Sequence, residues 1–345
     1  MEKICKATIL LFLISTAAYT QENLKYAETI KSADLKKHVF ILASDSLEGR
    51  ETGKRGQKKA ALYIKNHFKS IGIPPYRGKK YYQKFKVKTK RHVCKCEDCD
   101  VNFLQKIFGN RKKIKGENVL GYIEGGELKD ELLVITSHYD HLGKHDSLIY
   151  NGADDNASGT AAAMQIAEAF MIAKREGFGP KRSVLIMAVS GEEKGLLGSK
   201  WYTNNPIYPL ENTVANLNID MIGRIGDFQK EPNYVYLIGS DMLSTDLHNL
   251  SEEVNKKHVG LRLDYTFNSE DDPNRYYYRS DHYNFAKNNI PVIFYFNGIH
   301  EDYHKPTDTI EKLDFNKIKK ISQLVFLTAW EIANREERLV VDKAK

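Results

Sequence analysis

The sequence lacks, outside its N-terminus, any apolar run approaching the roughly 20 residues that a membrane-spanning helix needs. The N-terminal apolar segment Ala7–Ala18 has about the length of a signal-peptide core, and a short basic region with Lys3 and Lys6 precedes it. Small residues at its end predict cleavage near Thr20–Gln21. We therefore expect residues 1–20 to be a signal peptide, with export to the periplasm or the cell exterior and no stable membrane insertion after cleavage.

Cysteine is also scarce, with 4 in 345 residues. Cys5 lies before the apolar segment and is badly placed for lipid attachment at the cleavage site. The other three form a cluster of Cys94, Cys96 and Cys99, which in an oxidising compartment favours one local disulfide in a surface loop. The alternative is a metal site with His92 as the fourth ligand, since a structural zinc site needs four.

The chain has no patterned basic stripe, although its formal net charge is +7. Its lysines are scattered, with short basic clusters at 77–80 and 111–115. A nucleic-acid-binding surface needs a basic stripe with interleaved reading residues, so the pattern predicts a solvated surface and no nucleic-acid partner.

From residue 118 onward, buried-strand patterns alternate with helical patterns. Strands are expected at 119–124, 132–136, 184–189, 214–219, 234–238 and 291–296, and helices at 28–43, 56–72, 159–174, 195–204 and 315–335. Ser32 is the expected cap of the first helix. Strands that are apolar on both faces and separated by helices favour a mostly parallel α/β sheet covered by helices.

No linker, low-complexity tract or internal repeat divides the chain. The economical prediction is therefore a single catalytic domain over residues 21–345. Residues 73–117 and 225–280 are expected to be excursions from it, and the second is expected to shape a substrate pocket. An acidic cluster at 270–272 is interpreted as a solvated loop.

Polar residues follow three of the expected strands. His138 and Asp140 follow the strand expected at 132–136, the pair Glu192 and Glu193 follows the strand at 184–189, and Asp220 ends the strand at 214–219. In parallel α/β sheets functional groups gather at the carboxyl ends of strands, so these side chains are expected to converge. Histidine and carboxylate are zinc ligands, and the pattern contains the ligands of a two-metal hydrolytic site with one spare carboxylate as base.

Five motifs in this order resemble the secreted co-catalytic zinc aminopeptidase family, which includes the bacterial leucyl aminopeptidases. Glutamate carboxypeptidase and glutaminyl cyclase are relatives. The motifs are His138–Asp140, Gly152–Gly159, Ser190–Gly195, Asn218–Asp220 and Tyr303–Thr309. The resemblance extends from about residue 35 to the final helix and implies a three-layer α/β/α sandwich with a mostly parallel mixed central sheet.

The resemblance also implies two zinc ions. His138 and Asp220 belong to one ion, Glu193 and His304 belong to the other, and Asp155 bridges both. Two ions that share a carboxylate would supply a nucleophilic water at neutral pH and clamp a tetrahedral intermediate.

Further roles follow from the same resemblance. Glu192 is the expected general base, and Asp140 is expected to orient His138 through its second ring nitrogen. An oxyanion stabiliser is expected to be a tyrosine. Tyr277 has the matching offset, and Tyr303 is its competitor.

Several neighbouring residues have other interpretations. Asp154 competes with Asp155 for the bridging position and is otherwise expected to cap the following turn. Residues 280–282 spell Ser-Asp-His, but residues this close in sequence rarely form a catalytic triad. Three further histidines are expected at the surface: His141, His145 and His300.

The sequence therefore predicts an exported di-zinc exopeptidase, an aminopeptidase that removes N-terminal residues from peptides. The alternatives on the same scaffold are a carboxypeptidase, a dipeptidase or a glutaminyl cyclase. A cyclase of this kind typically uses a single zinc. A non-catalytic binding relative is a further alternative, but such proteins usually lack a ligand or the base, and here every expected ligand is present.

Overall fold

The computed structural model describes residues 23–343 except 77, 79, 90–111 and 270. The predicted signal peptide and the three clustered cysteines lie outside the described residues. Within them, no helix combines the length and apolarity needed to cross a lipid bilayer.

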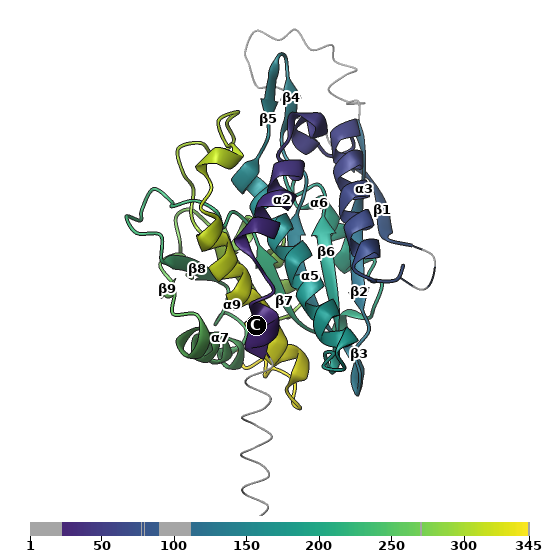
Figure 1. The fold of residues 1–345 in the computed structure, drawn as a ribbon, viewed down its shortest axis with the longest axis vertical. Coiled ribbons are helices and arrows are strands. Elements are labelled where there is room, and N and C mark those ends of the chain that lie inside the picture. Colours follow the sequence, from purple (N-terminus) through teal and green to yellow (C-terminus); the bar gives the residue numbers. More distant parts are fainter. Residues whose placement is uncertain (1–22, 77, 79, 90–111, 270, 344–345) are drawn as a thin grey trace, which may run out of the picture.

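An eight-stranded mixed sheet forms the centre (Figure 1), in the order β1-β2-β6-β3-β7-β10-β8-β9. Its strands are β1 Tyr82–Thr89, β2 Lys112–Ile123, β3 Leu128–His138, β6 Arg182–Val189, β7 Thr213–Ile219, β8 Tyr234–Ile238, β9 Arg262–Asp264 and β10 Val292–Phe296, with a separate hairpin of β4 Gly143–His145 and β5 Leu148–Tyr150. The four central strands β6, β3, β7 and β10 are mutually parallel. The outer strands β2 and β8 run antiparallel to their inner neighbours.

Helices cover both faces of this sheet. The α-helices are α2 Ser32–Leu42, α3 Arg55–Ser70, α5 Gly159–Arg175, α6 Leu197–Asn204, α7 Thr245–His258, α8 His282–Ala286 and α9 Phe315–Asn334. Alternate side chains of β3 point to opposite layers: Leu133 and Ile135 join the core under α2, α3, α5 and α9, whereas Leu132 and Val134 join the core under α6 and α8. The three-layer sandwich is therefore confirmed.

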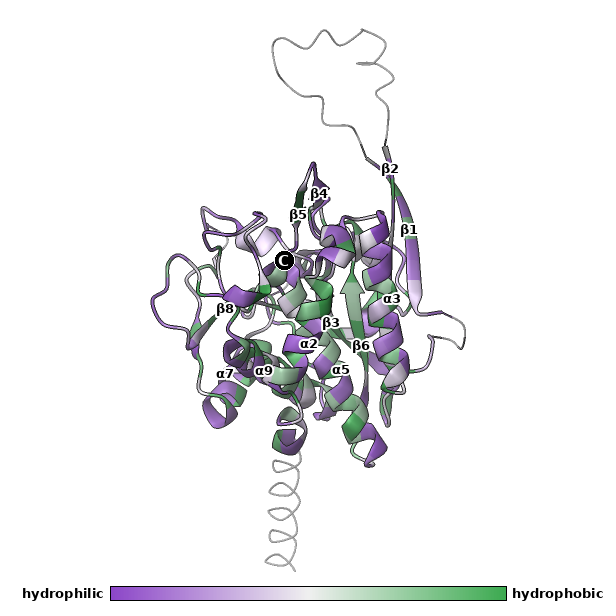
Figure 2. Cartoon of the chain, turned by 45° about the horizontal axis from the view of Figure 1, so that its top comes forward, coloured by the Kyte–Doolittle hydropathy of each residue, from purple (hydrophilic) through white to green (hydrophobic). Residues whose placement is uncertain are grey.

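Burial on both faces explains the apolar run Val184–Val189 in β6. Every residue of β6 is buried, and this strand is green in the hydropathy colouring of Figure 2, while β1 at the sheet edge is largely purple. A central parallel strand has no solvent-facing side, so apolar residues can occupy both of its faces.

Some expectations require correction. The segments 73–117 and 225–280 contribute β1, half of β2, β8 and β9 to the main sheet, so they are not simply excursions from it. Ser32 is the first residue of α2 and does not cap it; its hydroxyl instead donates to the carbonyl of Phe315 at the start of α9. The hydroxyl thus joins two helices.

Candidate metal centre

The carboxyl ends of the central parallel strands bring the predicted ligands to one edge of the sheet. His138, the last residue of β3, stands opposite Val189, the last residue of β6. On the other side of β3, Thr136 pairs with Asn218 of β7. The residues that follow these strands, Glu192 and Asp220 among them, therefore begin at the same edge, as parallel pairing requires.

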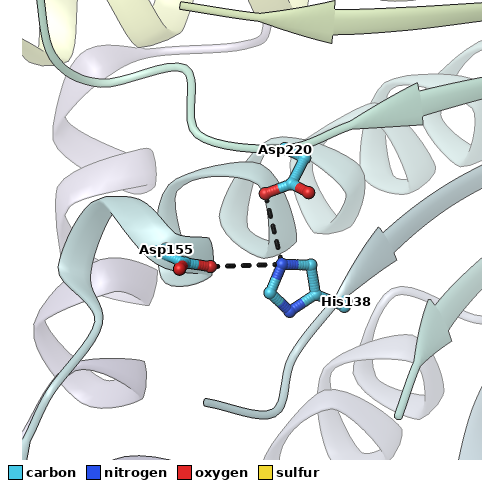
Figure 3. A group of neighbouring side chains, drawn as sticks. All are labelled: His138, Asp155 and Asp220. Atoms are coloured by element: carbon cyan, nitrogen blue, oxygen red, sulfur yellow. Dashed lines mark hydrogen bonds and ion pairs between the residues drawn. The ribbon is translucent and has the colours of Figure 1, made fainter. Parts of the chain in front are cut away.

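Asp155 lies at the centre of the cluster, with its two oxygens directed at different imidazoles. Its Oδ1 is 3.2 Å from Nε2 of His138, and its Oδ2 is 3.2 Å from Nε2 of His304. His138 Nε2 is also 3.2 Å from Oδ1 of Asp220, as Figure 3 shows, and His304 Nε2 is 3.3 Å from Oε2 of Glu193. The five predicted ligands thus form two groups that share Asp155.

The electrostatics of the cluster suit cations. Burial alone would lower the pKa of His138, but the neighbouring Asp220 and Asp155 raise it well above its usual value. Against the same burial effect, Asp155 and Glu193 raise the pKa of His304 to about 10. Both shifts report a strongly negative potential, which a bound divalent cation would neutralise.

The donor geometry also fits a metal. His138, Asp155 and Asp220 have ligand atoms within 4.8 Å of one another, and so do His141, Asp155 and Glu193. Imidazole nitrogen and carboxylate oxygen are zinc ligands, and three protein ligands leave a position open for water or substrate. The residues present therefore fit two zinc ions.

His141 is a member of the cluster that the sequence analysis places wrongly at the surface. Its side chain is fully buried, and its Nδ1 is 2.8 Å from Oε1 of Glu193 and 3.7 Å from Oδ2 of Asp155. Its Nε2 is buried with no hydrogen-bond partner among the described residues. The signal in the sequence was its position three residues after His138, just beyond the strand end.

The other two histidines expected at the surface behave differently from each other. His145 is exposed, as expected. His300 is buried, and its Nε2 is 3.3 Å from Oδ2 of Asp154. The carboxylate of Asp154 also accepts the backbone N–H of Gly223 at 2.6 Å, so it does not cap the following turn. Because its carboxylate contacts His300 and Gly223, Asp154 does not take the position between the two groups of ligands, which Asp155 occupies.

Asp140 supports His138, but through a different atom from the one expected. The Nδ1 of His138 is 3.1 Å from the backbone carbonyl of Asp140, whereas the carboxylate lies 3.9 Å away. The carboxylate accepts the hydroxyl of Thr52 and the backbone N–H of Glu192. The carbonyl therefore fixes the tautomer that leaves Nε2 of His138 free to bind metal, and the carboxylate positions the loop that carries Glu192.

Asp308 fixes the turn that carries Asp155. Its carboxylate accepts the backbone N–H groups of Asp154 and Asp155, each at 3.1 Å. Burial, reinforced by the nearby Asp154, raises the pKa of Asp308 to about 6. Asp308 thus ties the segment of His304 to the segment of Asp155.

Arg50, to which the sequence analysis gave no role, links the backbone segments around the cluster through hydrogen bonds. Its fully buried guanidinium donates to the backbone carbonyls of Leu42, Tyr139, Asn151 and Gly152. Burial lowers its pKa to about 10, although Asp155 and other nearby carboxylates favour the charged form. Arg50 therefore joins the segment after β3 to the turn of Asp155 without entering the cluster.

The geometry of the site does not support the prediction of Tyr277 as oxyanion stabiliser. The cavity beside the cluster is lined by Tyr276 and Tyr303, but not by Tyr277. The ring of Tyr277 packs edge-on against His282. Consecutive residues of a 3₁₀ turn point about 120° apart, so only one of the three tyrosines in this turn faces a given side.

Tyr303 stacks on His304 with ring centroids 3.9 Å apart, and burial raises its pKa.

The segment 280–282 does not form a triad. Ser280 donates to Oδ2 of Asp220 at 2.7 Å, Asp281 accepts the hydroxyl of Ser199, and His282 stacks on Phe294. Its three side chains thus have separate partners, and that of Ser280 holds one candidate metal ligand in place.

Comparison with known proteins agrees with this geometry. The profile of peptidase family M28 matches residues 118–329, more than half of the chain. A probable zinc metalloprotease of Pyrenophora tritici-repentis is 29% identical over 261 residues, which are 63% of this chain and 51% of that relative, so the chain spans about half of its length. A probable glutamate carboxypeptidase of Arabidopsis thaliana is 36% identical over 107 residues, 31% of this chain and 15% of that protein.

The fold has solved counterparts. The LapA aminopeptidase of Legionella pneumophila superposes with a TM-score of 0.68 at 21% identity, covering 92% of this chain and 75% of that one. At this identity the likeness shows a shared fold and nothing more. The shared fold agrees with the sheet whose strand ends bring the cluster together.

Proposed function

The chain belongs to peptidase family M28, and from this premise we propose that it is an exported di-zinc exopeptidase that removes N-terminal residues from peptides. The observation that carries the proposal is the placement of Asp155, whose two oxygens face His138 and His304 separately. A carboxylate in this position suits two ions better than one.

In this proposal the two zinc ions have distinct ligand sets. His138, Asp155 and Asp220 would hold the first ion, and Asp155, Glu193 and His304 the second. His141 lies close enough to the second set to bind the ion or to hold Glu193 in place. When bound, zinc supplies Lewis acidity that polarises a carbonyl and lowers the pKa of water.

Glu192 is the proposed general base. Burial raises its pKa well above the usual value, and the neighbouring Glu193 and Asp220 raise it further, against the effect of His138. A carboxylate with a raised pKa accepts a proton from the attacking water more readily near neutral pH and can pass it to the leaving amine. The proton is thus transferred within the site, and the base is regenerated when the peptide bond breaks.

Tyr303 is the proposed oxyanion stabiliser in place of Tyr277. It lines the same cavity as His138, Glu192 and Asp220. A phenol kept protonated by burial can donate a hydrogen bond to an oxyanion.

The first test is the zinc content of the purified mature protein, paired with hydrolysis of a panel of aminoacyl p-nitroanilides before and after chelation. We expect about two zinc ions per chain and cleavage that chelation abolishes and zinc restores. Two ions without cleavage of any aminoacyl substrate would replace the aminopeptidase with a carboxypeptidase or dipeptidase. One ion per chain would contradict the bridging role of Asp155 and favour a glutaminyl cyclase.

Export is tested separately. We propose that residues 1–20 are removed and that the mature protein is periplasmic or extracellular. Expression with its own N-terminus, fractionation and N-terminal sequencing should give a mature chain that begins near Gln21. An intact N-terminus retained in the cytoplasm would contradict this part of the proposal.

A further inference from the structure

The cavity beside the metal centre contains one cationic side chain that belongs to no candidate ligand set, and it is that of Arg279. The rest of the wall combines candidate ligands, the proposed base Glu192 and other polar residues with four apolar ones: Met221, Phe294, Phe296 and Ile299. A cation that faces a small cavity next to a metal centre is a selective group, because it favours ligands that carry a negative charge.

The structure holds Arg279 close to the reacting groups. It directly precedes Ser280, whose hydroxyl donates to Oδ2 of Asp220 at 2.7 Å. Its guanidinium carbon lies 5.1 Å from the ring centroid of Tyr276, which lines the same cavity. Its positive charge also reaches Tyr303, where it opposes the rise in pKa that burial causes. The guanidinium is therefore held next to the ring of Tyr276, and its charge acts on Tyr303 in the same cavity.

Arg279 also has no ion pair within the part of the chain that the structure describes. Other arginines of this region do have one: Arg224 is 2.9 Å from Asp302, and Arg262 is 2.7 Å from Asp264. The side chain of Arg279 is exposed at the cavity. A guanidinium presents a planar fork of donors that matches a carboxylate, so this group is available for a carboxylate from outside the chain.

We propose that Arg279 binds a carboxylate of the substrate located within one residue of the scissile peptide bond. This inference rests on the proposed function and names its substrate class. Two sources present the same chemistry: the side chain of an acidic first residue, and the free C-terminus of a dipeptide. Both would place a negative charge inside the cavity, where Arg279 is the cationic side chain outside the candidate ligand sets.

Matched substrate pairs test the proposal and separate the two sources. The first pair is glutamyl and glutaminyl p-nitroanilide, and the second is the dipeptide Leu-Gly and its C-terminal amide. We expect the wild type to favour the charged member of one pair by about tenfold or more in kcat/KM, because a charge-assisted hydrogen bond stabilises its complex enough to give a difference of this size. The pair that shows the preference identifies the source of the carboxylate.

Two variants assign that preference to Arg279. Arg279→Gln should remove the preference, so that the ratio of kcat/KM between the charged and the neutral member of that pair falls to about one. Arg275→Gln is the matched control, because Arg275 is an exposed arginine in the same segment, lies over the ring of Tyr278 at 4.6 Å and is not among the cavity-lining residues. It should keep the wild-type preference.

The outcomes separate this inference from the proposed function. Equal kcat/KM within both pairs, or an unchanged preference in Arg279→Gln, would overturn the role of Arg279 while leaving the peptidase intact. If the zinc-loaded wild type cleaves none of the substrates, calorimetric titration with glutamate and glutamine, and with Leu-Gly and its amide, decides the question. Tighter binding of a charged member that Arg279→Gln removes would support the carboxylate site. Equal binding of both members of each pair would overturn it.

Discussion

At the residue scale, two glutamates that are neighbours in the chain have opposite electrostatic surroundings. Burial raises the pKa of both, but hydrogen bonds from His141 and His304 outweigh it at Glu193 and lower its pKa. No comparable imidazole contact serves Glu192 within the described residues, and its pKa is raised. One carboxylate is therefore suited to bind a cation and the other to accept a proton.

This difference predicts distinct phenotypes for two isosteric substitutions. Glu192→Gln should retain about two zinc ions and lower kcat by about 10²–10⁴-fold, since general-base catalysis is lost. Glu193→Gln should lose zinc as well as activity. Metal analysis and steady-state kinetics on both variants are the measurements, with the exposed Glu127→Gln as control. Full turnover by Glu192→Gln would exclude it as the base.

Residues at strand ends could be predicted from sequence because the strands themselves were recognisable. His138, Glu193 and Asp220 have a ligand chemistry and a position that the α/β pattern makes meaningful. His141, just beyond a strand end, carried the same signal, but Arg50 could not be predicted in this way. Its contacts with Tyr139, Asn151 and Gly152 join residues 89 to 102 positions away, and no local periodicity encodes such contacts.

At the element scale, Arg50 replaces regular secondary structure as the link between segments. It joins the end of α2, the residue after β3 and the turn before Asp155, all through backbone carbonyls. The carbonyl of Gly152 also accepts the backbone N–H of Ala157, so loss of the guanidinium would chiefly leave the buried carbonyls of Leu42 and Tyr139 without this donor.

Arg50→Met should therefore destabilise the protein by about 3 kcal/mol or more, because it leaves several buried acceptors unsatisfied. Arg50→Lys should be only partly better, since an ammonium cannot reproduce the planar fork. Urea denaturation is the measurement, and Arg55→Met, an exposed arginine at the start of α3, is the control. Equal stability of Arg50→Met and the control would contradict the linking role.

The α9 helix carries a buried lysine that links it to β8. The Nζ of Lys317 donates to the carbonyls of Pro232 and Tyr234 at 2.7 Å and lies 3.7 Å from the ring centroid of Tyr234. Burial lowers its pKa from 10.5 to about 7; Arg262 adds to this effect, and Asp154 and Asp314 oppose it.

This lysine predicts a pH-dependent contribution to stability. Between about pH 7 and 10.5 the unfolded state binds more protons at Lys317 than the folded state, so stability rises with pH in this window. The free energy of unfolding of the wild type, relative to Lys317→Met, should therefore increase with pH, with a slope of at most about 1.4 kcal/mol per pH unit. Denaturation at pH 6, 7.5 and 9 measures it. A pH-independent difference would show that the ammonium remains charged throughout.

The elements themselves were predictable to different degrees. Because β6 is buried on both faces, its sequence contains the continuous apolar run Val184–Val189, which is too short for a typical helix and therefore indicates a strand. The edge strand β1, with the sequence YQKFKVKT, alternates lysines with apolar residues and pairs only with β2. Its place in the sheet is set by this long-range pairing, so the sequence analysis assigned its segment, 73–117, to an excursion from the domain.

At the scale of the whole molecule, the candidate metal centre joins segments that are far apart in the chain. Its ligands follow β3, β6 and β7 or lie in the turn of Asp155 and the loop of His304. Several carboxylates converge there, and their repulsion opposes folding unless cations are present. Zinc should therefore stabilise the folded chain as well as enable catalysis.

Removal of metal should accordingly lower the free energy of unfolding, by about 2.7 kcal/mol for each ion whose free concentration was 100-fold above its Kd. The shared position of Asp155 makes the effect of its substitution distinctive. The Asp155→Asn variant should bind both zinc ions more weakly, and most of its zinc-dependent rise in Tm should disappear. The Asp220→Asn variant should bind mainly the ion at His138 more weakly. Thermal unfolding at several zinc concentrations, with zinc counted on each variant, measures both effects. If Asp155→Asn retained one tightly bound ion and Asp220→Asn lost both, Asp155 would belong to a single ion, because a bridging ligand cannot be removed without disturbing both positions.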